Sequence, residues 1–369
     1  MVLGFSGLLP NAAVGLASVV LLVFGAEKVV GKMEGVAKAY GISEVVIAMT
    51  IISVGTSLPE ISLHLVGSFN ILTNPGNQQL YQQISATVLG SNIGSDVVQQ
   101  TLVLGLVVLV TAFMRNSRGF KFSRKFLLRD YAPMMGTTLL TLILAWDRTL
   151  SVFDGLVLLN FFIAYMYYLY STRDEKLQKQ GSSEPSQRPR YDLVTGIVFM
   201  LLVIYSADVF LKVVELGIEA TGLSGSMIGV ATVGVVSAMP EMVTAITGLR
   251  QGAEGISLGT LIGSNITNPL LAIGAGATLS TYAVPEPLVL WDLPMETATA
   301  GVLLIYLLNK GRIGDFLGSI AGGLGFEKLA QKFRSTEDRF LTMTGAVLLM
   351  LMYVFYLYVR WTYFPTDFH

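Results

Sequence analysis

The chain has no cysteine and few charged residues. The lack of cysteine in 369 residues excludes disulfide bonds and thiolate metal sites, and it leaves the cellular compartment open. Only 13% of the residues are charged, against roughly 25% in soluble domains. Hydrophobic residues make up 53%, and the mean hydropathy is +0.63. These values exclude a soluble fold and indicate an integral membrane protein. The net charge of −1 gives no indication of a nucleic-acid partner.

The motif GTSLPE, residues 55–60, interrupts a long apolar segment. Between Glu44 and Val66 the only further carboxylate is Glu60. Pro59 cannot donate the hydrogen bond of an unbroken helix, and Gly55 is a weak point one turn earlier, so we expect the helix to open at this motif. A carboxylate at a broken helix inside a membrane predicts an ion site.

A second copy of this arrangement follows in the other half of the chain. Residues 236–241 read VSAMPE, again with a Pro-Glu pair in an apolar segment. Each copy is followed by a GSNI element, at residues 90–93 and 263–266. The segments before the two Pro-Glu pairs also align, at a constant offset of 181. The chain is therefore a duplicated unit.

Ten segments are long and apolar enough to span a bilayer. They are residues 11–30, 44–69, 82–113, 131–147, 151–170, 192–218, 226–248, 254–280, 293–309 and 340–361. Five precede the polar segment 171–192 and five follow it. An odd number of spans per unit makes the second unit enter from the opposite side. We therefore predict an all-α integral membrane protein of ten transmembrane helices, arranged as two inverted five-helix repeats with broken helices at the ion site.

The predicted domains follow from this duplication. The first repeat is residues 1–170, the cytoplasmic linker is 171–192, and the second repeat is 193–369. Segment 11–30 is read as a retained span, since its basic residues follow it, whereas a cleaved signal peptide would carry them in front.

The distribution of basic residues predicts the orientation. With the N-terminus outside, the inner loops hold twenty Lys and Arg residues, and the outer loops and C-terminal tail hold only Arg148 and Arg360. An excess of basic residues marks cytoplasmic loops. We therefore expect a multi-pass protein of the cell membrane with both termini on the non-cytoplasmic side.

The two motif pairs resemble the alpha repeats of the calcium:cation antiporter superfamily, which contains the sodium/calcium exchangers and their proton-coupled relatives. GTSLPE followed by GSNI, and SAMPE followed by GSNITN, carry the resemblance. It implies alpha repeats at about 44–113 and 226–280. It also implies exchange of Ca²⁺ for Na⁺ or H⁺.

The residue types in these motifs suit a calcium site. Ca²⁺ takes six to eight oxygen ligands. The two Pro-Glu motifs supply the carboxylates, the broken backbone supplies carbonyl groups at 53–57 and 234–238, and neighbouring segments supply hydroxyl and amide groups. The family resemblance implies the same positions. The candidate ligands are Glu60, Glu241, Thr56, Ser57, Ser91, Ser95, Ser237, Ser264, Asn268, Ser53, Gly234 and Asp96. Small residues in a membrane helix also serve close packing, which is the alternative for each serine and glycine.

One departure from the family pattern concerns a third carboxylate. The resemblance to sodium/calcium exchangers implies a third carboxylate, an Asp two residues beyond one GSNI element, where this chain has Ser95 and Asn268. Asp96 is one residue further on, about 100° round the helix. We expect it to face elsewhere, or else to compensate through a local bulge.

The predicted function is therefore secondary antiport of Ca²⁺ against a monovalent cation by alternating access, with Na⁺ favoured over H⁺. Two carboxylates balance about two monovalent charges per Ca²⁺, and a measured ratio of three Na⁺ would implicate Asp96. A Ca²⁺/H⁺ antiporter and a cation channel or uniporter are the alternatives. We expect no enzymatic activity, since no nucleophile-base pair or nucleotide motif is present. We also expect no tightly bound cofactor, no nucleic-acid partner, and a functional monomer within the lipid bilayer.

Overall fold

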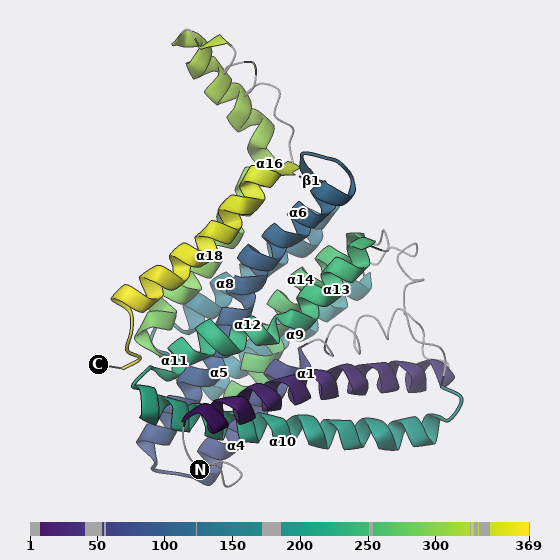
Figure 1. Ribbon diagram of the computed structural model, residues 1–369, viewed down its shortest axis with the longest axis vertical. Coiled ribbons are helices and arrows are strands. Elements are labelled where there is room, and N and C mark those ends of the chain that lie inside the picture. Colours follow the sequence, from purple (N-terminus) through teal and green to yellow (C-terminus); the bar gives the residue numbers. More distant parts are fainter. Residues whose placement is uncertain are drawn as a thin grey trace.

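The computed structural model describes residues 8–40, 54, 57–122, 124–171, 186–250, 254–324, 326–327, 331 and 340–368. The described chain is mostly helical, with short π-helical turns (η) inside several helices and four short strands (Figure 1). The first half contains α1 (Leu8–Ala39), α4 (Leu58–Thr73), α5 (Gln78–Val98), η2 (Gln99–Val103), α6 (Leu104–Met114), β1 (Gly119–Lys121), α7 (Arg124–Phe126), η3 (Leu127–Tyr131), α8 (Ala132–Leu144), β2 (Thr149–Leu150) and α9 (Val152–Ser171). The second half contains α10 (Pro189–Thr221), α11 (Gly225–Ile228), η5 (Gly229–Val233), α12 (Gly234–Ser237), α13 (Met239–Arg250), α14 (Glu254–Thr267), η6 (Asn268–Ile273), α15 (Gly274–Leu279), β3 (Tyr282–Ala283), η7 (Leu288–Asp292), α16 (Leu293–Gly323), β4 (Phe340–Thr342) and α18 (Met343–Tyr363).

The two longest described helices, α1 and α10, form a pair. They have 32 and 33 residues and pack along each other. Figure 1 shows the pair lying across the direction of α6, α13 and α18. The chain therefore has two parts that differ in helix direction: this pair, and a bundle of the remaining helices.

The helix that continues from α5 through η2 into α6 lies at the centre of the bundle. In the most apolar stretch of Gln78–Met114, 67% of the residues are buried, whereas in Val152–Leu169 of α9 only 11% are. Asn77 begins α5 as a helix cap, because its side chain accepts a hydrogen bond from the Leu80 N–H at 3.0 Å. Protein surrounds α5, while α9 presents most of its apolar surface to the outside, as expected of a helix that faces lipid.

Six helices in the described part of the chain are long and apolar enough to cross a membrane. The other four predicted spans fall on shorter or interrupted helices: α4, α8, the series α11–η5–α12–α13, and the series α14–η6–α15. Breaks or π-helical turns divide the two series, and residues 44–53 and 55–56 of the predicted span 44–69 lie outside the described residues. The count of ten spans therefore stays a prediction.

Two short antiparallel pairings modify the predicted all-α fold. Strand β1 pairs with β4, with Phe120 opposite Leu341, and β2 pairs with β3, with Leu150 opposite Tyr282. Each pairing joins loops that are far apart in the sequence. The backbone groups of these loops are thereby hydrogen-bonded to each other at the ends of the helices.

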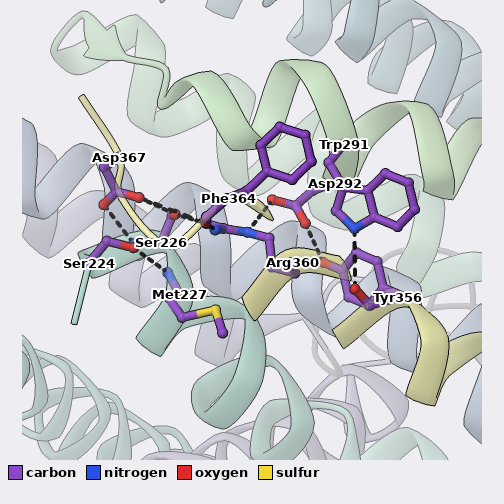
Figure 2. A network of polar contacts seen from close by, with 9 residues as sticks. All are labelled: Ser224, Ser226, Met227, Trp291, Asp292, Tyr356, Arg360, Phe364 and Asp367. Carbon is purple, nitrogen blue, oxygen red and sulfur yellow. Dashed lines mark hydrogen bonds and ion pairs between the residues drawn. The ribbon is translucent and has the colours of Figure 1, made fainter. Parts of the chain in front are cut away.

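A buried cluster of charged and polar residues joins the C-terminal tail to the start of α11 (Figure 2). The Arg360 side chain is fully buried and donates from Nε to Asp292 Oδ2 at 3.0 Å. Tyr356 Oη donates to the other oxygen of Asp292 at 2.6 Å. Trp291 Nε1 donates to the Tyr356 carbonyl at 3.2 Å. These contacts connect η7 with α18.

The same arginine reaches the tail beyond α18. Its guanidinium donates to the Phe364 carbonyl and to Ser226 Oγ, and it lies 3.8 Å from the Asp367 carboxylate. Asp367 accepts hydrogen bonds from the Ser226 backbone N–H, at 3.0 Å, and from the Ser226 hydroxyl. The tail therefore supplies a carboxylate to the N-terminus of α11, where the helix dipole favours negative charge.

Candidate functional site

Each Pro-Glu pair lies in the first turn of a helix. In the first half, α4 begins at Leu58 and carries Glu60 in its first turn. In the second half, α12 ends at Ser237, and α13 begins at Met239 with Glu241 in its first turn. Proline is tolerated at a helix start, because the N–H that it lacks would have no partner there. The partial positive charge of a helix start stabilises a carboxylate at both places.

The two carboxylates are buried and lie near each other. Glu60 is 1% exposed and Glu241 is 0% exposed. They are close enough for a direct electrostatic interaction. Ser95 Oγ donates to Glu60 Oε1 at 3.4 Å, and the Ser237 hydroxyl also reaches this carboxylate. The structure thus brings together two carboxylates and two serines from both halves of the chain.

The backbones of α5 and of the interrupted helix in the second half are in direct contact. A Cβ atom on Gly94 would lie 2.6 Å from Cα of Val230, and one on Gly234 would lie 2.5 Å from the backbone N of Ser95. No side chain fits at these distances, so glycine is required for the close approach. The contact holds the start of α12 against the last turn of α5, where Ser95 lies.

Gly234 does not supply the free carbonyl that the sequence predicted. Its oxygen accepts hydrogen bonds from the Ala238 N–H at 3.1 Å and from Ser237 Oγ at 3.3 Å. The helix continues through Ser237, so the break begins later than expected, and this prediction is wrong. Two other candidate ligands, Ser53 and Thr56, lie outside the described residues.

The remaining serine candidates are all buried but differ in their partners. The hydroxyl groups of Ser57 and Ser91 have no hydrogen-bond partner. Ser264 Oγ donates to Gln99 Oε1 at 2.6 Å. Ser57 and Ser91 therefore have oxygen atoms available for a ligand, whereas Ser264 is part of a hydrogen-bonded chain.

Asp96 faces the polar interior, so the expectation that it faces elsewhere is wrong. Asn268 Nδ2 donates to Asp96 Oδ1 at 2.9 Å. One turn earlier on the same face of α5, Asn92 Nδ2 donates to the Asn268 carbonyl at 3.2 Å. Asp96 is also close enough to Glu60 and Glu241 for electrostatic interaction. The physical reason is that residues 84–98 of α5 are all buried, so faces of this helix 100° apart both meet protein.

A chain of buried side chains that sequence reasoning missed extends from this cluster. Gln99 Nε2 donates to Ser95 Oγ at 3.1 Å, and Gln99 Oε1 accepts from Asn265 Nδ2 at 2.9 Å. Gln100 Nε2 donates to Asn265 Oδ1 at 2.9 Å and to Glu296 Oε1 at 3.3 Å. The signal that identified Glu60, a carboxylate inside a predicted span, could also have identified Glu296.

Several buried oxygen atoms of the cluster have no hydrogen-bond donor. They are Ser57 Oγ, Glu60 Oε2, Ser91 Oγ, Asn92 Oδ1, Gln100 Oε1, both Glu241 carboxylate oxygens and Asn268 Oδ1. A buried unsatisfied group costs about 1–3 kcal/mol, and more when it is charged. Hard cations bind carboxylate, amide and hydroxyl oxygens, so a cation would satisfy these atoms. Among the described residues, no three acidic or histidine side chains gather around one point.

The comparison with family models gives one match along the chain. The model described as sodium/calcium exchanger protein matches residues 11–171 and 191–362. The unmatched residues between these two ranges fall in the predicted linker. The match thus covers most of both halves.

Relatives and solved structures agree with this family. The chain is 25% identical over 351 residues to the sodium/calcium exchanger MaX1 of Methanosarcina acetivorans, which covers 84% of this chain and 95% of MaX1. It resembles the solved sodium-calcium exchanger NCX_Mj with a TM-score of 0.55 and 19% identity, covering 95% of this chain and 98% of that one. It resembles the solved H⁺/Ca²⁺ exchanger CAX with a TM-score of 0.66 and 16% identity, covering 95% and 83%.

These likenesses to solved structures show a shared fold. The described apolar helices agree with the membrane location that the fold requires. Since the family model matches most of its residues, this chain is an integral multi-pass membrane protein that belongs to the sodium/calcium exchanger protein family.

Proposed function

We propose that this protein is a secondary antiporter that exchanges Ca²⁺ for a monovalent cation, with Na⁺ favoured, by alternating access. The observation that carries this proposal is the pair of buried carboxylates, Glu60 and Glu241, contributed by the two halves at helix starts. Their free oxygen atoms lie among unsatisfied hydroxyl and amide oxygens. Discontinuous helices that meet at a buried site are typical of secondary transporters.

The two glutamates are the primary ligands in this proposal. Around them the neutral candidates Ser57, Ser91, Ser95 and Asn268 add oxygen ligands of the kind that Ca²⁺ and Na⁺ bind. Family membership and the likeness to MaX1, which is named a sodium/calcium exchanger, support the choice of ions.

The proposed architecture is two inverted five-helix repeats, residues 1–170 and 193–369, joined by the linker 171–192. The strand pairings support it. β1 follows α6 and pairs with the strand before α18, while β3 follows α15 and pairs with the strand before α9. If α6 corresponds to α15 and α9 corresponds to α18, a two-fold axis that relates the two repeats also relates the β1–β4 pairing to the β2–β3 pairing.

The π-helical turns repeat in the same way. η3 leads into α8 and η7 leads into α16, and each is followed by a Pro-Met pair, Pro133–Met134 and Pro294–Met295. η2 follows α5, and η6 follows α14. The two halves thus share local irregularities as well as sequence motifs, as expected of one duplicated unit.

In this architecture the α1–α10 pair slides across the bundle and opens the site to one side at a time. The pair crosses the bundle direction and contacts α4, the helix that carries Glu60 (Figure 1). We place both termini on the non-cytoplasmic side of the cell membrane, since the basic residues then lie in inner loops. One chain contains both carboxylates, so a monomer suffices.

A Ca²⁺/H⁺ antiporter is the second candidate. The likeness to the solved H⁺/Ca²⁺ exchanger favours it, since that structure has the higher TM-score of the two compared, 0.66 against 0.55. Two protons could neutralise the same two carboxylates. A channel or uniporter is less well supported, because inverted repeats with broken helices are typical of alternating access.

Calcium flux into proteoliposomes tests the proposal. The purified protein is reconstituted with Na⁺ inside, with an acidic interior, or with neither gradient, and uptake of ⁴⁵Ca²⁺ is measured. We expect uptake only when a counter-ion gradient is present, and the larger rate with Na⁺. Uptake that needs no counter-ion would indicate a channel or uniporter, and uptake driven by H⁺ alone would identify the second candidate.

A further inference from the structure

An open hollow lies where α1 ends and α10 begins. Its volume is about 410 Å³, and it is lined by Tyr40, just after α1, and by Arg188, Pro189, Arg190 and Tyr191 at the start of α10. In Figure 1 this end of the α1–α10 pair lies away from the bundle helices. The proposed orientation places it on the cytoplasmic side of the membrane.

The hollow carries two positive charges that no acidic side chain compensates within the described residues. Arg188 and Arg190 are exposed, and neither takes part in an ion pair there. The nearby carboxylate of Asp192 is already engaged: its Oδ1 lies 2.6 Å from Lys32 Nζ, and its Oδ2 accepts from Ser186 Oγ at 2.6 Å. A guanidinium binds phosphate through two parallel N–H···O bonds. The uncompensated charge therefore favours an anionic ligand, and the two arginines suit a phosphate.

Hydrogen bonds hold the two sides of the hollow together. The Ser186 N–H donates to the Gly35 carbonyl in α1 at 3.0 Å, and the Arg188 N–H donates to Ser186 Oγ at 3.1 Å. The Lys32–Asp192 ion pair adds a third link between α1 and α10. The lining residues are thus positioned before a ligand arrives, which lowers the entropic cost of binding.

The surroundings of the hollow indicate a lipid as the source of the anion. Tyr40 and Tyr191 are 64% and 63% exposed, and tyrosine is enriched where a membrane meets water. Four apolar side chains of α10, each more than half exposed, continue from the hollow: Val194, Ile197, Val198 and Leu201. Residues three or four apart share a helix face, so this apolar stripe begins one turn after Arg190. An acyl chain that lies along the stripe therefore brings its headgroup to the arginines.

We propose that the hollow binds the phosphate headgroup of an acidic phospholipid of the cytoplasmic leaflet, with an acyl chain along the apolar stripe of α10. Arg188 and Arg190 bind the phosphate oxygens, and Tyr40 and Tyr191 border the headgroup. A zwitterionic headgroup would bring its own cation beside two uncompensated arginines, so a lipid with net negative charge is favoured. The choice of leaflet rests on the proposed orientation, whereas binding requires neither Ca²⁺ nor exchange.

Lipid titration of the full chain in detergent micelles tests the site. Phosphatidylglycerol, phosphatidylcholine with the same acyl chains, and inorganic phosphate are added in parallel, and bound molecules are counted by native mass spectrometry. We expect one phosphatidylglycerol to bind more tightly than either of the others. The double variant Arg188→Gln, Arg190→Gln should weaken its binding about 30-fold, since each basic residue at an acidic membrane surface contributes a factor of about five.

The matched control is the double variant Arg118→Gln, Arg124→Gln. It removes the same charge from two exposed arginines of another predicted inner loop and should keep the wild-type affinity. Tyr40→Ala keeps both arginines of the hollow and should weaken phosphatidylglycerol binding severalfold. Affinity unchanged by Tyr40→Ala would show that surface charge alone attracts the lipid, which contradicts a site in the hollow.

The remaining outcomes are equally decisive. Equal binding of phosphatidylglycerol and phosphatidylcholine overturns the acidic headgroup, and equal binding by the wild type and the Arg188, Arg190 variant overturns the site. Inorganic phosphate that binds as tightly as the lipid would show a site for a free anion instead. The substituted arginines are exposed and outside any described ion pair, so the variant is expected to fold, and thermal unfolding checks this. Because no step measures Ca²⁺ flux, failure of the proposed antiport would leave the result unaffected.

Discussion

Two clusters of buried charge lie in this protein, and they differ in whether the charge is compensated. In the cluster of Figure 2, Arg360 pairs with Asp292 and lies near Asp367. No buried side-chain nitrogen or oxygen of the nine residues drawn there, all of them described, lacks a partner. In the candidate ion site, Glu60 and Glu241 have three oxygens without a donor.

The difference teaches what each cluster does. A buried charge with its counter-charge and hydrogen bonds in place needs nothing further, so the Figure 2 cluster is an anchor that ties η7, α18 and the tail to the start of α11. A buried charge without them costs free energy until an ion supplies the missing charge. The ion site is therefore built to be incomplete. Variants at the two clusters should have opposite effects on stability.

The largest effect is expected at the two glutamates. Glu60→Gln or Glu241→Gln should reduce Ca²⁺ exchange at least about 100-fold, because one carboxylate cannot compensate a divalent ion in a low-dielectric site. Without Ca²⁺, the stability of either variant should equal or exceed that of the wild type, since a buried unpaired charge is removed. Proteoliposome flux and thermal unfolding measure both. Substantial exchange by either variant contradicts the assignment of that residue as a ligand.

A reversible block is expected when the α1–α10 pair is tied to the bundle. Asn70 Nδ2 in α4 lies 3.5 Å from Asp208 Oδ1 in α10, and the chain has no cysteine of its own. A disulfide in the Asn70→Cys, Asp208→Cys variant should stop exchange, while Ca²⁺ binding continues. Flux before and after reduction measures this. The reduced variant is the control, and exchange that survives efficient cross-linking contradicts the sliding of the pair.

At the compensated cluster, loss of the arginine should destabilise the fold. Arg360→Gln leaves Asp292 buried without its counter-charge, which costs about 3–5 kcal/mol of unfolding free energy. Denaturant unfolding in detergent micelles measures the loss. The matched control is Arg360→Gln with Asp292→Asn, which should recover most of it because no charge is left unpaired. A stable single variant would show that Arg360 is dispensable as the counter-charge.

The smallest effect is expected at the end of the tail. Asp367→Asn keeps an oxygen that can accept from the Ser226 N–H but removes the charge at the start of α11. We expect a loss of about 0.5–2 kcal/mol, the range of helix-cap changes. The same unfolding experiment measures it. A loss as large as that of Arg360→Gln would show that the attachment of the tail to α11 depends on the charge of Asp367.

Much of the site followed from local sequence features. Proline and glycine act on the backbone where they stand, so the positions of Glu60 and Glu241 in the first turns of helices were predicted from two short motifs. The sequence also predicted an apolar, helical membrane protein of this family, which the family model confirms. The ten spans, their sidedness and the two inverted repeats stay predictions.

The facing of Asp96 and the roles of Gln99, Gln100 and Glu296 depended on the tertiary structure. A rotation of 100° from Ser95 predicts a different face of α5, but it does not predict what lies against that face. Asn268, the first residue of η6, meets Asp96 because the bundle encloses residues 84–98 of α5 on every side. In the same way, only the packing of η7 against α18 decided that Asp292 is paired with Arg360 and that Glu296, one turn later, is not.

The sequence by itself determined which charges enter the membrane interior, because each is a covalent part of an apolar segment. The tertiary structure decided which of them are compensated, because compensation depends on contacts between segments far apart in the chain.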